Sequence, residues 1–218
     1  ATVFANPDKA EELKRLNDQF GDQADTFLGN LDKLDEFEEL AVDFQGDATK
    51  MATVFANPDK AEELKRLNDQ FGDQADTFLG NLDKLDEFEE LAVDFQGDAT
   101  KMATVFANPD KAEELKRLND QFGDQADTFL GNLDKLDEFE ELAVDFQGDA
   151  TKMATVFANP DKAEELKRLN DQFGDQADTF LGNLDKLDEF EELASDFGGD
   201  PTKMATVFAN PDKAEELK

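Results

Sequence analysis

The sequence contains no cysteine, histidine, tryptophan or tyrosine, and Ser195 is its only serine. Without cysteine no disulfide can form, and without cysteine and histidine no thiolate or imidazole zinc site can be built. Ser-His-Asp and Cys-His arrangements are excluded for the same reason. The first glycines, Gly21, Gly29 and Gly46, are too widely spaced for a phosphate-binding loop. We therefore expect no enzymatic activity, no cofactor, and no catalytic, cofactor-binding or metal-ligating residues.

Long apolar runs and basic residues are also scarce. No apolar run approaches the ~20 residues that a membrane-spanning helix needs, and no signal peptide is visible. The chain has 22 basic residues against 55 acidic ones, a net charge of −33. Such a surface repels phosphates and anionic lipid headgroups, so neither nucleic acid nor a membrane is an expected partner. It favours cations, so a basic protein and weakly bound divalent cations are the candidate partners.

What the chain does contain is one stretch of 51 residues written four times. The copies are residues 1–51, 52–102, 103–153 and 154–204, with a partial fifth at 205–218. The first three are identical, and the fourth has Ser195 in place of Val, Gly198 in place of Gln and Pro201 in place of Ala. A fixed period of this length is typical of repeat architectures. One copy is near the lower size limit for independent stability, so we expect residues 1–218 to form a single array whose copies share a core.

The first predicted helix of a copy spans Pro7–Phe20. Asn6 is placed to cap it, and proline is well tolerated at the first helical position. Apolar residues recur at spacings of three and four and form one stripe: Ala10, Leu13, Leu16 and Phe20. Gly21 stands where a left-handed residue commonly ends a helix.

The second predicted helix, Asp22–Phe44, is the longest. Asp22 can cap it, and Gln45-Gly46 ends it. Its apolar positions cover more than half of the helix circumference, whereas a surface helix needs a stripe of about 100°. They are Ala24, Phe27, Leu28, Leu31, Leu34, Phe37, Leu40, Ala41, Val42 and Phe44. We therefore expect this helix to be covered on two sides, by its own copy and by a neighbouring one.

A seven-residue spacing leaves an alternative open. Leu13, Phe20, Phe27, Leu34 and Ala41 keep one register straight through Gly21. A single helix over residues 7–44, about 57 Å long, would satisfy this register. An isolated glycine costs only about 1 kcal/mol inside a helix. We favour two helices broken at Gly21, because the neighbouring residues carry both a stop signal and a start signal.

A short third helix is predicted from Ala48 to about Ala56. Asp47 is placed to cap it. In the fourth copy Pro201 takes the first helical position, which supports this start. Asn57-Pro58 ends the helix, since the residue before a proline disfavours helical backbone angles. The inner face is marked by Met51, Val54 and Phe55.

Three helices per copy without linkers predict an all-α solenoid of four repeats and a partial fifth. In this layout the chain resembles armadillo and HEAT repeats, which are all-helical and of similar length. The resemblance is one of layout only, since no residue motif identifies either family. A string of separate three-helix bundles is the alternative. The absence of a Gly/Ser/Pro-rich linker between copies counts against it.

Other residues divide into core and surface positions. The phenylalanines fall on apolar faces and are predicted to be core, namely Phe4, Phe20, Phe27, Phe37 and Phe44. A neighbouring copy could cover Val42, Val93 and Val144. Ser195 replaces this valine in the fourth copy, either as a polar end cap or through sequence drift. No role is expected for exposed polar residues such as Asn17, Gln19 and Asn30.

Acidic side chains crowd the second predicted helix: Asp32, Asp35, Glu36, Glu38, Glu39 and Asp43. An acid–base site would need two carboxylates at a set separation in a cleft, and four identical sites would be unusual for an enzyme. The calcium-loop pattern is absent from the sequence. We interpret these residues as a solvated acidic face, with weak calcium or magnesium binding as the alternative.

Near identity between copies suggests that number and length matter more than any one site. The sequence thus predicts a non-enzymatic structural or spacer protein. It would be either an array from a larger surface or adhesin-like protein, or an engineered repeat scaffold. The alternative is an acidic solenoid binding module for a basic peptide or protein. Residues 1–14 and 205–218 are identical, so head-to-tail self-association is a further expectation.

Overall fold

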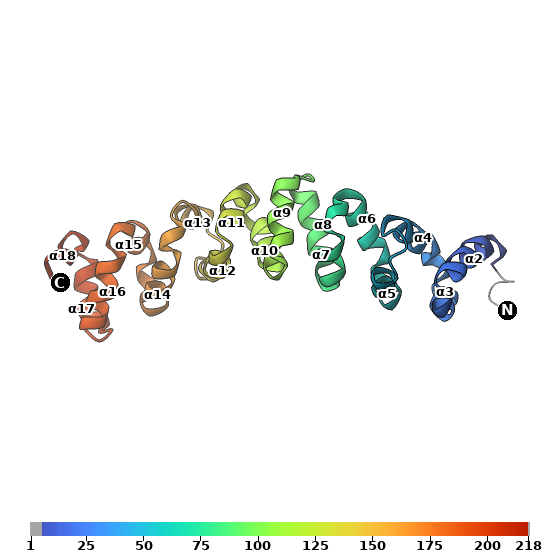
Figure 1. Ribbon diagram of the computed structural model, residues 1–218. Coiled ribbons are helices and arrows are strands. Elements are labelled where there is room, and N and C mark those ends of the chain that lie inside the picture. Colours follow the sequence, from blue (N-terminus) through green and yellow to red (C-terminus); the bar gives the residue numbers. More distant parts are fainter. Residues whose placement is uncertain (1–5, 218) are drawn as a thin grey trace. The chain divides into compact units, whose positions relative to one another are not determined.

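The computed structural model describes residues 6–217, and every regular element in this range is helical (Figure 1). The fold is the predicted all-α repeat solenoid. Contacts divide the chain into two compact units, Ala1–Glu113 and Glu114–Lys218. The α-helices are α2 (Ala10–Gln19), α3 (Ala24–Gly29), α4 (Leu34–Asp43), α5 (Ala48–Ala56), α6 (Ala61–Phe71), α7 (Ala75–Gly80), α8 (Leu85–Asp94), α9 (Ala99–Ala107), α10 (Ala112–Phe122), α11 (Ala126–Gly131), α12 (Leu136–Asp145), α13 (Ala150–Phe157), α14 (Ala163–Phe173), α15 (Ala177–Leu181), α16 (Leu187–Asp196), α17 (Pro201–Phe208) and α18 (Ala214–Leu217).

Each full period within residues 6–217 holds four α-helices, where three were predicted. Single 3-10 turns precede the first three of them. In the first period these turns are Pro7–Lys9, Gly21–Gln23 and Leu31–Lys33. The short helix predicted from Ala48 to Ala56 is confirmed as α5.

The predicted long helix Asp22–Phe44 is wrong, because the chain breaks at Asn30 between α3 and α4. Asn30 leaves the helical conformation with φ −133° and ψ 53°. Its side-chain Nδ2 donates a hydrogen bond to the Thr26 carbonyl at 2.8 Å. The side-chain amide therefore takes the place of the backbone N–H that would bond to this carbonyl in a continuing helix. Residues 30–33 match residues 57–60 at three of four positions, and Asn57 ends α5 with nearly the same angles. This local similarity is the sequence signal that marked the break.

The predicted break near Gly21 is confirmed, and a single helix over residues 7–44 is excluded. Its cause differs from the one predicted. The backbone turns at Phe20, which has φ −132° and ψ 49°, while Gly72, the counterpart of Gly21, has a right-handed φ of −55°. The predicted caps Asn6 and Asp22 are wrong as well. Asn6 makes no side-chain capping bond, and α3 begins one residue beyond the position that Asp22 would cap.

The end of α4 and the start of α5 agree with prediction. Gln45 and Gly46 have φ values of 54° and 72°, and Gly46 N donates to the Ala41 carbonyl at 2.7 Å. The Asp47 side chain accepts hydrogen bonds from two backbone N–H groups of α5 at 2.9 and 3.1 Å. In the fourth copy Gly198 (φ 62°) replaces a left-handed glutamine, which removes the steric cost of a side chain there.

The core of each structural repeat is a cluster of four phenyl rings. In the first cluster Phe55 has ring centroids 5.3, 5.0 and 5.3 Å from those of Phe20, Phe27 and Phe37. The same arrangement surrounds Phe106, Phe157 and Phe208. Because Phe55 belongs to the second sequence copy, the structural repeat runs from residue 7 to residue 57. The core prediction for Phe4 lies outside the described residues.

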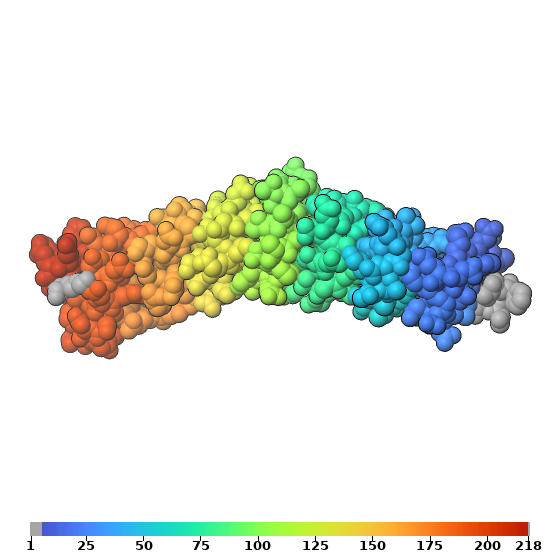
Figure 2. All heavy atoms as spheres, in the orientation of Figure 1, coloured from blue at the N-terminus to red at the C-terminus, as the bar shows by residue number. Residues whose placement is uncertain are grey.

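Helices of adjacent copies pack against one another within each unit. α4 contacts α2 of its own copy and α6 of the next, and α14 likewise lies between α12 and α16. Figure 1 shows α2, α4 and α6 in one row and α3, α5 and α7 in the other. In Figure 2 the atoms of the first copy (blue) adjoin those of the second without a gap. Copies thus share a core within a unit, as the wide apolar face predicted.

The prediction that a neighbouring copy covers Val42 is wrong. Val42, Val93 and Val144 are 76%, 77% and 77% exposed, and Ser195 is exposed too. The position is open to solvent in every copy, so a polar end cap does not account for the change from valine to serine. Nothing in the structure explains this substitution.

Alanine substitutions at two glycines of the second copy should have opposite effects on the free energy of unfolding. A Cβ on Gly72 would meet nothing within 4 Å, and its φ is −55°, so Gly72→Ala should raise the free energy of unfolding by about 0.4–1 kcal/mol. Gly97 has φ +70°, so Gly97→Ala should lower it by about 1–2 kcal/mol through backbone strain. Urea unfolding measures both changes. A Gly97→Ala variant as stable as Gly72→Ala would contradict the left-handed turn.

Candidate binding grooves

Some of the acidic residues predicted to form a solvated face form ion pairs with lysine or arginine. Glu38 accepts two hydrogen bonds from Arg15, at 2.6 and 2.8 Å, and this pairing raises the pKa of the arginine. Asp35 accepts a hydrogen bond from Lys9 at 2.8 Å. Of these three carboxylates, Asp32 is exposed and makes no ion pair or hydrogen bond to a neighbouring helix among residues 6–217. The face is therefore a mixture of helix-joining pairs and free surface charge.

Two further carboxylates of α4 join one copy to the next. Glu39 pairs with Lys65 at 3.3 Å, and Asp43 accepts a hydrogen bond from Asn68 at 2.9 Å. Burial opposes the charge of Lys65, but hydrogen bonds to Asp69 and Glu39 outweigh it and raise the pKa of the lysine. Both contacts recur in the second unit, as Lys167 with Glu141 and Asn170 with Asp145.

The role of Asn68 was missed in the sequence. It is the counterpart of Asn17, which was assigned no role, and it is only 8% exposed. Its neighbours in α6 are largely charged, so local pattern gave no reason to bury it. The reason is tertiary, since the amide hydrogen-bonds a carboxylate of the preceding copy.

Glu36 is the remaining member of the acidic set. It is half-buried in the first turn of α4, where the helix dipole favours a negative charge. Its Oε2 is buried and has no hydrogen-bond partner among the described residues, as in Glu87, Glu138 and Glu189. Across residues 6–217, no group of three or more Asp and Glu side chains is placed to hold a metal ion. Weak calcium or magnesium binding stays a prediction.

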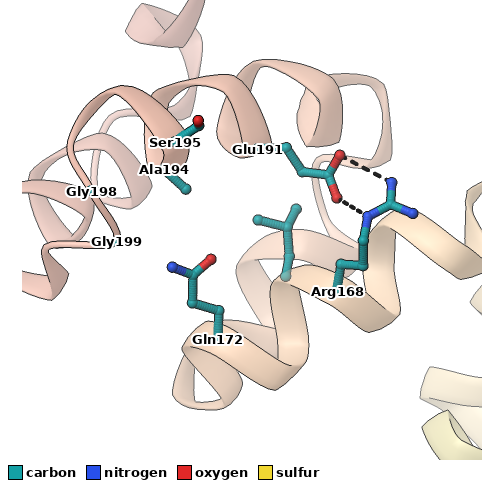
Figure 3. Close-up of a pocket in the computed structure, with 8 residues that line it drawn as sticks. Arg168, Gln172, Glu191, Ala194, Ser195, Gly198 and Gly199 are labelled. Carbon is teal, nitrogen blue, oxygen red and sulfur yellow. Dashed lines mark hydrogen bonds and ion pairs between the residues drawn. The ribbon is translucent and has the colours of Figure 1, made fainter.

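A groove of about 400 Å³ lies between α14 and α16 (Figure 3). Arg168 and Glu191 close one side of it through a bidentate pair, with distances of 2.6 and 3.1 Å. Gln172 and Ser195 line the other side. Because both Glu191 oxygens already accept hydrogen bonds from the arginine, the only serine of the chain has no free carboxylate partner in this groove.

A second groove, of about 530 Å³, lies at the junction of the first two copies. Its charged side chains are paired. Asn68 bonds to Asp43, and Lys50 lies 2.9 Å from Asp76 and 5.6 Å from the centre of the Phe44 ring. This groove is therefore part of the packing between copies rather than an open binding surface.

A third kind of groove recurs in the second, third and fourth copies, and we call it the repeat groove. It measures about 300, 300 and 290 Å³ in these copies. The groove of the third copy lies between the turn at residues 121–125 and the face of α13 that carries Ala150 and Ala154, with Phe157 at its floor; the last two residues belong to the fourth copy. In the sequence, these positions carry only the signals of a helix stop and of a buried core. The groove arises because small side chains of α13 face the turn.

Comparison with protein-family models, with curated proteins and with solved structures gave no match. None of the helices within residues 6–217 combines the length and the apolar character needed to cross a bilayer.

Proposed function

We propose that the chain is a non-enzymatic structural array in which copy number sets the length of a spacer. The observation that carries the proposal is the repetition of one packing arrangement, α4 on α6 in one unit and α12 on α14 in the other. Identical copies joined by identical contacts suit a spacer, whose useful property is its length. A surface-protein array and an engineered repeat scaffold would both use this property.

Chains of two, four and six copies test the spacer function. Their maximum dimension, measured by small-angle X-ray scattering, should rise by a constant increment per copy, because each copy would add the same contacts to its neighbour. A matched series with the buried α6-type leucines changed to aspartate, such as Leu64→Asp, serves as the unfolded reference. A maximum dimension that stays constant between four and six copies would contradict the proposal.

The second candidate function is an acidic binding module for a basic peptide or protein. It is favoured by the net charge of −33 and by the recurrence of the repeat groove. Such binding should weaken with salt, since added ions screen charges on the surface. The two functions are compatible, because a spacer can also carry binding sites.

A further inference from the structure

The repeat groove combines an apolar floor with an open wall. In the third copy Phe122 is half-buried, and its ring centroid lies 5.2 Å from that of the nearly buried Phe157. Ala154 is exposed on the α13 side of the groove. Aliphatic carbon of an incoming side chain can therefore lie on phenyl and methyl groups without displacing a protein side chain.

The rim of the groove carries an unneutralised carboxylate. Asp124 lines the groove in the third copy, as Asp73 and Asp175 do in the second and fourth, and all three are exposed. None of the three forms an ion pair or hydrogen bond in the part of the chain that the structure describes, and no lysine or arginine lines the grooves there. This sets the repeat groove apart from the other two grooves, whose carboxylates are paired.

A glycine keeps the groove open. Gly72, Gly123 and Gly174 line it, and a Cβ on any of them would meet nothing within 4 Å. The φ values of Gly72 and Gly174 are −55° and −52°, which any residue can adopt. Neither backbone conformation nor internal packing therefore requires glycine, although it weakens the adjoining helix. With no side chain, this residue adds no atoms to the groove.

We propose that the repeat grooves are docking sites for arginine side chains of an extended, arginine-rich peptide. The aliphatic stem would lie on the phenylalanine and alanine floor, as such stems do on apolar surfaces. The guanidinium would form a bidentate pair with the rim aspartate, a geometry that lysine cannot match. The net charge of −33 would attract such a peptide from a distance. This inference deepens the second candidate function, the acidic binding module, and rests on it, but it does not depend on the spacer function.

Fluorescein-labelled nona-arginine is the probe, and its affinity for the full 218-residue chain is measured by fluorescence anisotropy at low salt. One variant changes the rim aspartates Asp73, Asp124 and Asp175 to asparagine, together with Asp22, their counterpart in the first copy. Its affinity should fall by about tenfold or more, because hydrogen bonds to a charged group are lost at each groove.

The matched control removes the same charge elsewhere, through asparagine at Asp8, Asp59, Asp110 and Asp161. These aspartates are exposed and line none of the repeat grooves. The affinity of this variant should change by less than about twofold, because it alters only the general field. Equal losses in the two variants would show that charge alone attracts the peptide and would overturn the proposal. Absence of binding to the unmodified chain would overturn it as well.

A second pair of variants fills the groove without changing charge. Leucine at Ala103, Ala154 and Ala205, together with their counterpart Ala52, should weaken nona-arginine binding by about tenfold, because the side chains in the grooves occupy the space of the aliphatic stem. Leucine at Ala56, Ala107, Ala158 and Ala209 is the control, since these exposed alanines stand at the last residue of the same helices or one position beyond it, and line no repeat groove. Circular dichroism checks that all variants stay helical. Equal binding of nona-lysine and nona-arginine would contradict the assignment to arginine.

Discussion

Replacing Phe106 with alanine is expected to lower the free energy of unfolding by about 3–5 kcal/mol. Phe106 is 4% exposed, and its ring centroid lies 5.2, 5.1 and 5.3 Å from those of Phe71, Phe78 and Phe88. Truncation would remove the ring that touches all three others and leave a cavity in the centre of the cluster. Edge-on ring pairs add to the loss beyond the buried area. Chemical denaturation followed by circular dichroism measures the change.

Val93→Ala is the control for this substitution. Val93 lies in the same structural repeat but is 77% exposed, so its truncation should change the free energy of unfolding by less than about 0.5 kcal/mol. If Phe106→Ala lowered the free energy of unfolding no more than Val93→Ala does, α9 could not be packed against the phenyl cluster. The structural repeat would then not run across the boundary of the sequence copies.

Local sequence signals predicted some of the helix ends correctly and missed one break. Asp47 caps α5 and Gln45-Gly46 ends α4 as predicted, because these signals act over four or five residues of backbone. The break at Asn30 was missed because apolar periodicity over residues 22–44 continues across it. The asparagine side chain bonds to the carbonyl four residues earlier, which ends the helix without any proline or left-handed glycine.

Contacts between copies were harder to foresee. The width of the apolar face correctly predicted that α4 would be covered from two sides. It could not tell which residue at the edge of that face stays outside, and Val42 stays exposed while Phe44 is buried. Likewise, the burial of Asn68 depends on Asp43 of the preceding copy, 25 positions away. Such choices depend on the angle at which helices meet, which the sequence pattern of one helix does not contain.

The candidate grooves, too, could be predicted only in part from the sequence. Composition alone predicted a polyanionic surface with no histidine, cysteine or phosphate-loop chemistry. It could not separate paired carboxylates, such as Glu38 with Arg15, from an unpaired one, such as Asp124. Pairing depends on which helices face one another, so the unpaired rim aspartate became visible only in the folded chain.

The shared core between copies can be measured with one pair of substitutions. Residues 7–20 and 58–71 are identical in sequence, yet Leu64 is 1% exposed and its counterpart Leu13 is half-buried. The difference arises because α6 packs against both α4 and α8, whereas α2 packs mainly against α4. Since the local sequence is the same, differences in helix propensity cancel, and only packing between copies distinguishes the two sites.

Leu64→Ala is expected to lower the free energy of unfolding by about 2–5 kcal/mol, and Leu13→Ala by about half of that or less. Urea denaturation of the two single variants beside the unmodified chain gives both values. A Leu64→Ala loss that exceeds the Leu13→Ala loss by about 1 kcal/mol or more is the result that a core shared between copies requires. Equal losses would mean that each copy is stabilised on its own, and would contradict the stacked array.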